Sequence, residues 1–260
     1  MRLATLTVQA VQDYLKQSQT VLIPVGSIEN HGKHMPLGTD MLIPDAITEL
    51  LEKNENCHLM IAPAIPYGAT DNIYGFPGTI TIGTDGLIML LTKVTDSLYR
   101  YGFRKFIILN GHGGNQKAIE AVGLKLHKKG AWLANLNWWL MAGELHPEWK
   151  GGHGGAQETA AVMGIDPSLI DMRYIHEPMA LSNDVSPDMP TTGWSTVNFK
   201  GATVVIPREY INYSGNGWYG SDSPDKATPQ WGKEMLQTMA DYIADFAAAF
   251  DKTALPVSHK

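Results

Sequence analysis

The sequence predicts an α/β fold with a mostly parallel sheet and helices on both of its faces. Short apolar runs of strand length alternate with longer segments in which apolar residues recur every three or four positions. This alternation is typical of parallel strands connected by helices that cover the sheet. No internal repeat or sharp change in composition divides the chain, so residues 1–260 are predicted to form a single domain with one long functional loop.

Four apolar runs are expected to form the buried strands of this sheet. They occupy residues 20–26, 59–65, 105–111 and 132–138. Each is short and is apolar or β-branched over most of its length, as is usual for buried strands.

Helices are expected between these strands, at 43–54, 84–102 and 115–130. The second begins after a Thr-Asp pair that can cap it and ends at Gly102. The third ends in basic residues and Gly130, where the helix dipole favours positive charge.

The pattern loosens beyond residue 151. Residues 154–165 are typical of the start of a helix, and 229–252 form a long amphipathic pattern that predicts a C-terminal helix. The segment between them, 184–229, is rich in turn residues and is expected to hold only one or two short strands.

Composition excludes several classes of function. The formal net charge is −6 and no long basic cluster occurs, so neither a nucleic acid nor an anionic membrane surface is an expected partner. No run of about 18 apolar residues could span a membrane, and the first residues lack the apolar core of a secretory signal, so a cytoplasmic location is expected. Cys57 is the single cysteine, so any metal must be bound by His, Asp and Glu.

Three polar segments lie where a functional site is expected, because ligands of open α/β sheets bind beyond the carboxyl ends of the strands. The segments are "GSIENHGKHMPLGTD" after the first strand, "NGHGGN" after the third, and "WKGGHGGAQET" further along. Glu29 and His31 alternate, so in an extended chain both would point to one face. The candidate residues are Glu29, His31, His34, Asp40, His112, His153 and Glu158.

Each candidate also has an ordinary structural interpretation. His112 could be a hydrogen-bonding turn residue, Asp40 a helix cap, and Glu158 an acid in the first turn of a helix. The joint occurrence of acids and imidazoles favours a site with cations between them, because such acids would otherwise repel one another. The glycines of "NGHGGN" could instead build a phosphate-binding turn, but no acid that could bind a ribose ends the next strand. The G-x-x-x-x-G-K-[ST] and G-x-S-x-G motifs are also missing.

The segments "PVGSIENHGKHMPLGTD", "FPGTITI", "NGHGGN" and "GGHGGAQET" resemble, in order and spacing, the signature segments of the creatininase family of metal hydrolases. This resemblance implies a single α/β domain with two divalent metal ions per chain. Zinc would be the default, and manganese or magnesium would suit the site richer in oxygen. The implied ligands are Glu29 and His112 for one ion and His31 and Glu158 for the other, with Asp40 bridging both.

The resemblance further implies a metal-dependent amidohydrolase and a homo-oligomer, commonly a hexamer. A hydroxide held by the metals would attack the carbonyl of a small, cyclic amide such as creatinine, and His153 would be the general acid/base. Trp139 and Trp149 match tryptophans near the family's substrate, and Gly113 and Gly114 would let the backbone approach it. His34 would at most support another ligand.

Two departures from the family pattern bear on the substrate. Gly113 and Gly114 stand where the enzyme that names the family has tyrosine and glutamate, although many other members share the two glycines. Asn72 and Ile73 stand where members often have glutamate and histidine. Formamides and cyclic ketones of sugar-like compounds therefore remain alternative substrates. A non-catalytic protein that binds a metal or a sugar is the alternative from another functional class.

Overall fold

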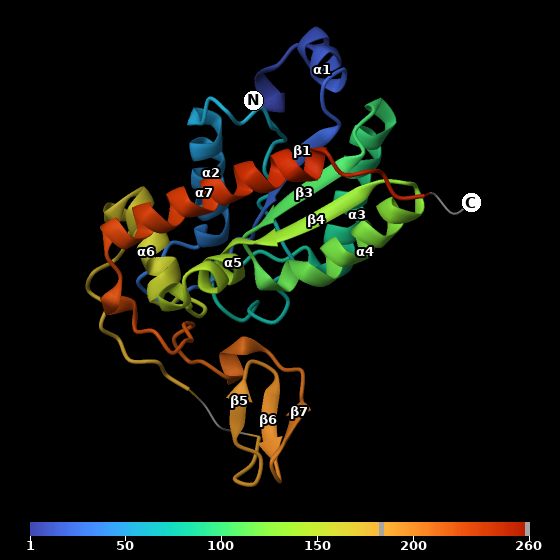
Figure 1. The fold of residues 1–260 in the computed structure, drawn as a ribbon. Helices are drawn as coiled ribbons and strands as arrows, with labels where there is room; N and C mark the ends of the chain where they lie inside the picture. Colours follow the sequence, from blue (N-terminus) through green and yellow to red (C-terminus); the bar gives the residue numbers. More distant parts are fainter. Residues whose placement is uncertain (182–184, 258–260) are drawn as a thin grey trace.

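A parallel four-stranded sheet forms the centre of the computed structural model, which describes residues 1–181 and 185–257 (Figure 1). The strand order is β2-β1-β3-β4, and every neighbouring pair is parallel. The α/β prediction is therefore confirmed. The strands are β1 (Thr20–Val25), β2 (Met60–Ile61), β3 (Lys105–Asn110) and β4 (Trp132–Asn137).

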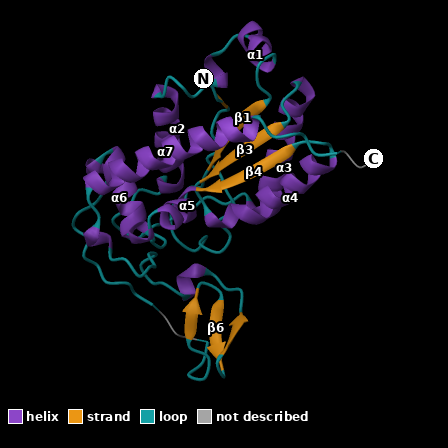
Figure 2. Cartoon of the chain, in the orientation of Figure 1, coloured by secondary structure: helices purple, strands orange, loops and turns teal. Residues whose placement is uncertain are grey.

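Helices cover both faces of this sheet (Figure 2). Leu22 and Ile107 pack on one side, whereas Val21 and Phe106 pack on the other, because successive side chains of a strand point to opposite faces. Burial on both faces explains why the strands appear in the sequence as unbroken apolar runs. Helices α2 (Thr39–Lys53), α6 (Ala156–Ile165) and α7 (Pro229–Asp251) cover the first face, and α1 (Val8–Leu15), α3 (Gly83–Tyr101) and α4 (Gln116–Lys128) cover the second.

Strand β2 is much shorter than the predicted run at 59–65. Only Met60–Ile61 pairs continuously with β1, and Ile65 makes one isolated bridge to Val25. Pro63 lies between them, and a proline cannot donate a hydrogen bond to the neighbouring strand.

Helix α2 begins four residues before its predicted start, at Thr39. Pro44 lies inside the helix, where it cannot donate a backbone hydrogen bond to the carbonyl of Asp40 four residues earlier. The early start places Asp40 in the first turn of α2, where its carboxylate is buried. A further helix that was not predicted, α5 (Trp138–Leu145), follows β4 directly.

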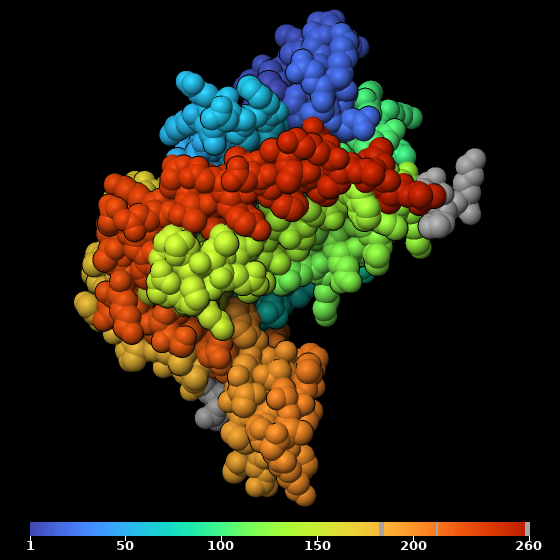
Figure 3. Space-filling model, in the orientation of Figure 1, coloured from blue at the N-terminus to red at the C-terminus, as the bar shows by residue number. Residues whose placement is uncertain are grey.

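The turn-rich segment forms a small antiparallel sheet with three strands, whereas one or two short strands were expected. Its strands are β5 (Thr191–Gly193), β6 (Thr196–Phe199) and β7 (Ala202–Val205), and we call residues 191–205 the arm. Figure 3 shows the arm standing out from the main body. Residues 182–184 lie outside the described residues, and the last of them is the first residue of the predicted segment. Within the part of the chain that is described, no helix has the length and apolar character to span a membrane.

Candidate metal centre

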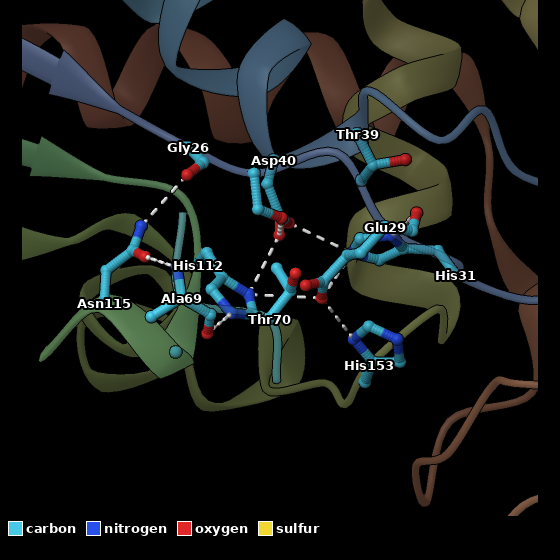
Figure 4. Close-up of polar contacts among 12 residues, drawn as sticks. Gly26, Glu29, His31, Thr39, Asp40, Ala69, Thr70, His112, Asn115 and His153 are labelled. Atoms are coloured by element: carbon cyan, nitrogen blue, oxygen red, sulfur yellow. Dashed lines mark hydrogen bonds and ion pairs between the residues drawn. The ribbon is translucent and has the colours of Figure 1, made fainter. Parts of the chain in front are cut away.

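Six side chains from five separate segments meet at the carboxyl edge of the main sheet, and Figure 4 labels all of them except Glu158. All six are buried. The loop after β1 provides two of them, and the first turn of α2, the loop after β3, the loop before α6 and the first turn of α6 provide one each. The residues are Glu29, His31, Asp40, His112, His153 and Glu158.

Two glycines allow the first turn of α2 to approach this edge closely. Gly26 follows β1 and Gly111 follows β3. A Cβ atom at either position would collide with the backbone carbonyl of Asp40. The glycines therefore bring the Asp40 carboxylate between the ends of the two strands.

Asp40 contacts a different imidazole with each of its carboxylate oxygens. Its Oδ2 lies 3.1 Å from His112 Nδ1, which is also 3.1 Å from Glu29 Oε1. Its Oδ1 lies 3.0 Å from His31 Nε2, which is 3.7 Å from Glu158 Oε2. Two candidate ligand groups thus share Asp40, in the arrangement that the resemblance implied.

The three imidazoles each have one ring nitrogen against a backbone carbonyl. A carbonyl can only accept a hydrogen bond, so that nitrogen carries the proton and the other is left unprotonated in the neutral ring. The free nitrogens face the carboxylates, as metal ligands require. The pairs are His31 Nδ1 with the carbonyl of Glu29 (3.2 Å), His112 Nε2 with that of Ala69 (3.0 Å) and His153 Nε2 with that of Asn30 (2.7 Å).

Glu29 supplies the observation that points most directly to a cation. Its side chain is fully buried, and among the described residues neither carboxylate oxygen has a hydrogen-bond partner of good geometry. A buried carboxylate without such partners is costly unless positive charge neutralises it. The surrounding donor atoms are only nitrogen and oxygen, a set that suits zinc and manganese, and magnesium where oxygen dominates.

In the absence of a cation, protons would compensate part of this negative charge. Burial by itself lowers the pKa of His31, but Asp40, Glu158 and Glu29 raise it to about 10. Burial raises the pKa of Glu158 to about 7, although the nearby His31 opposes the rise. Cations must therefore displace protons from the site, and their affinity should increase with pH.

We expect the free energy of unfolding of chelator-treated protein to fall by more than about 1 kcal/mol between pH 7 and pH 10. The pKa of His31 is higher in the folded state than in the unfolded state. Its protonation therefore stabilises the fold fully below about pH 6.5, and this stabilisation is lost as the pH rises through about 10. Urea unfolding at several pH values measures this. Metal-loaded protein and the variant His31→Asn should both show a smaller fall in the free energy of unfolding. An equal fall in these two and in the chelator-treated wild type would contradict the assignment of the raised pKa to His31.

His34 does not join the ligand groups. Its Nε2 lies 3.1 Å from the hydroxyl of Thr159, the residue that follows Glu158. Burial and the nearby His31 lower the pKa of His34 to about 4, so the ring is neutral at pH 7. His34 therefore contacts the helix that carries Glu158 instead of a cation.

A cavity of about 640 Å³ opens beside the carboxylates and imidazoles. Its wall includes three residues that were predicted to bind substrate, namely Gly113, Gly114 and Trp139. The structure corrects the fourth, Trp149, which is not among the lining residues. A short 3-10 turn carries it, and its ring packs in the core, where it stacks on His146 at 4.0 Å between ring centroids.

The arm contributes pocket residues that sequence reasoning missed. Trp194 lies in the turn between β5 and β6 and lines the cavity. Its ring is 5.0 Å from that of His153 and 4.3 Å from that of Tyr210, measured between centroids. A tryptophan in a turn-rich segment was the available signal, because large aromatic residues in loops often contact ligands. Asn72, Gln157 and Tyr219 also line the cavity.

The fold and the site together define an α/β protein with a buried centre of acids and imidazoles suited to divalent cations. Residues 4–247 match the model of the family described as "Creatininase: Creatinine amidohydrolase". The chain belongs to the creatininase family.

Several known proteins are similar to this chain. A mycofactocin precursor peptide peptidase from Mycolicibacterium smegmatis is 34% identical over 151 residues, which are 56% of this chain and 58% of that protein. A 3-dehydro-scyllo-inosose hydrolase from Thermotoga maritima is 34% identical over 140 residues, 52% of this chain and 44% of that protein. The chain thus spans about half the length of these relatives. A crystal structure of creatinine amidohydrolase matches with a TM-score of 0.73 and 21% identity, over 97% of this chain and 98% of that one, and so shares the fold.

Proposed function

We propose that the protein is a metal-dependent hydrolase that cleaves the C–N bond of a small, cyclic amide. The observation that carries the proposal is the buried Asp40 carboxylate, whose two oxygens face two candidate ligand groups. Glu29 and His112 would hold one divalent cation, and His31 and Glu158 the other. Creatininases of this fold have been solved in a form described as Zn-Zn and in one described as Mn, which supports zinc or manganese here.

The cations would supply positive charge that polarises a carbonyl group and makes water more acidic. Three carboxylates against two divalent ions leave one formal positive charge at the site. The remaining steps fall to the protein's own side chains, which must hold the substrate and move a proton.

His153 is suited to move that proton. The hydrogen bond from its Nε2 to the carbonyl of Asn30 fixes the ring, and its Nδ1 remains free, 3.8 Å from Glu29 Oε1. Burial and the nearby His31 hold the pKa of His153 well below its ordinary value, so the resting ring is neutral and readily releases a proton that it takes up from water. His153 also lines the cavity, from which it can pass this proton to the leaving nitrogen of an amide.

The pocket wall favours an uncharged substrate. Among the described residues that line it, none is a lysine or an arginine. Trp139 and Trp194 offer flat apolar surfaces on which a planar amide ring can stack. The relative described as a peptidase supports testing amide bonds outside rings as well.

A cyclic ketone of a sugar-like compound is the second candidate substrate. Hydroxyl and amide side chains on the wall can hydrogen-bond to the hydroxyl groups of such a ring, while the tryptophans stack on its apolar face. The relative described as an inosose hydrolase supports this candidate. The polar wall residues are Asn72, Gln116, Gln157, Ser195 and Thr196.

Metal analysis followed by a substrate panel tests both candidates. Purified protein is dialysed against zinc or manganese, its metal content is measured, and creatinine, hydantoins, lactams, formamides, short peptides and inososes are assayed. We expect two ions per chain and turnover of at least one amide that chelation abolishes. Turnover of inososes alone would favour the second candidate. Two bound ions without any turnover would instead favour a binding protein.

A further inference from the structure

The helix that carries Glu158 has no cap of its own at its N-terminus. Its N-cap residue is Gly155, which offers no side chain to accept a hydrogen bond from the first backbone N–H groups. Asp222, far along the chain, takes this role. Its Oδ2 accepts a hydrogen bond from the Gln157 N–H at 3.0 Å, and its backbone carbonyl accepts one from the Ala156 N–H at 3.3 Å.

Three glycines make room for the Asp222 carboxylate. A Cβ atom at Gly155 would lie 2.5 Å from Oδ1, one at Gly220 would lie 2.6 Å from Oδ1, and one at Gly151 would lie 2.7 Å from Oδ2. Two of these glycines flank the loop that carries His153. The loop and the carboxylate therefore fit together so closely that neither can shift alone.

The segment around Asp222 also holds the His153 loop directly. The Tyr219 N–H donates to the backbone carbonyl of His153 at 2.7 Å. Within the loop, the Gly154 N–H donates to Glu158 Oε2 at 2.6 Å. Residues 219–222 are thus bound both to the loop that carries His153, the candidate acid/base, and to the first turn of α6, which carries the candidate ligand Glu158.

We propose that Asp222 is a positioning residue that sets Glu158 and His153 against the cation pair. This inference rests on the proposed metal site. Asp222 belongs to none of the candidate ligand groups among the described residues, so it acts through the backbone of residues 151–157. Side chains that orient metal ligands in this indirect way typically change metal affinity by about 10- to 100-fold when removed.

The test compares two capping aspartates, one at the N-terminal end of α6 and one at the start of the short 3-10 helix that follows α6. Asp222→Ala removes the N-terminal cap, and Asp166→Ala removes a cap beyond the C-terminal end of α6, where Asp166 Oδ1 accepts from the Ser168 N–H at 2.9 Å. Zinc affinity is measured by competition with a chromophoric chelator, and stability by thermal unfolding. We expect Asp222→Ala to weaken binding of one ion at least tenfold, and Asp166→Ala to bind zinc like the wild type.

Asp222→Asn keeps an oxygen for the Gln157 N–H and should restore affinity to within about threefold of the wild type. If Asp222→Ala does not fold, Gly155→Ala replaces it, because the new methyl group must displace the carboxylate. Wild-type affinity in the tested variant, or equal loss in Asp166→Ala, would overturn the positioning role. Failure of the wild type to bind zinc would instead overturn the metal site itself.

Discussion

Asp40→Ala is expected to lose at least one of two bound cations per chain, and with it at least about 99% of the turnover. Each carboxylate oxygen of Asp40 faces a different ligand group, and Asp40 is the member that these two groups share. Ser27 donates to Asp40 Oδ2 at 2.7 Å and helps to fix the carboxylate in this orientation. Elemental analysis after exhaustive dialysis, combined with turnover of the best substrate, measures both effects.

A carboxylate further along the same helix provides the control. Asp45 lies on α2 but belongs to none of the candidate ligand groups. Asp45→Ala should retain both ions and full turnover, although the helix is altered in the same way. Retention of both ions by folded Asp40→Ala would contradict the bridging role and leave the two ligand groups without a common member.

The central sheet could be predicted because burial on both faces leaves a strong mark on the sequence. The runs at 20–26 and 105–111 each hold an unbroken apolar stretch, and short runs of this kind are typical of strands that are covered on both sides. The length of β2 was harder to predict, because Ile65 continues the apolar pattern beyond Pro63. Proline interrupts the hydrogen bonds of the strand without changing its hydropathy.

The candidate ligands could be located because parallel strands end at one edge of the sheet. Acids and imidazoles that follow different strands are brought together there, as Glu29 and His112 are. The direction of each imidazole could not be predicted in the same way. It depends on backbone carbonyls from distant loops, such as that of Ala69 beneath His112, and no local pattern records such a pairing.

Some residues of the pocket wall could not be predicted from the sequence. Trp149 and Trp194 are both tryptophans in turn-rich segments, yet one packs into the core and the other lines the cavity. The difference depends on long-range contacts, such as that between the rings of Trp194 and His153. Asp222 is a similar case, since its partner Gln157 is 65 residues away. The sequence signals this contact only through the glycines that make room for the Asp222 carboxylate.

His153→Ala is expected to lower kcat by about 10²- to 10⁴-fold while both cations stay bound. The structure also permits a competing role, because Glu29, His31 and His153 form a third group whose ligand atoms lie within 4.8 Å of one another. A ligand and a proton carrier differ in what their removal does to metal content. The variant must therefore be assayed for metal and for turnover in the same preparation.

The control for this variant is His146→Ala, which removes a half-exposed imidazole outside the candidate ligand groups. It should keep its metal and its kcat. If His153→Ala loses kcat and one cation together, His153 is a ligand, and the proton must be carried by another group on the cavity wall. Loss of kcat alone, with KM little changed, is the outcome that an acid/base role requires, because such a residue acts on the transition state and not on the bound substrate.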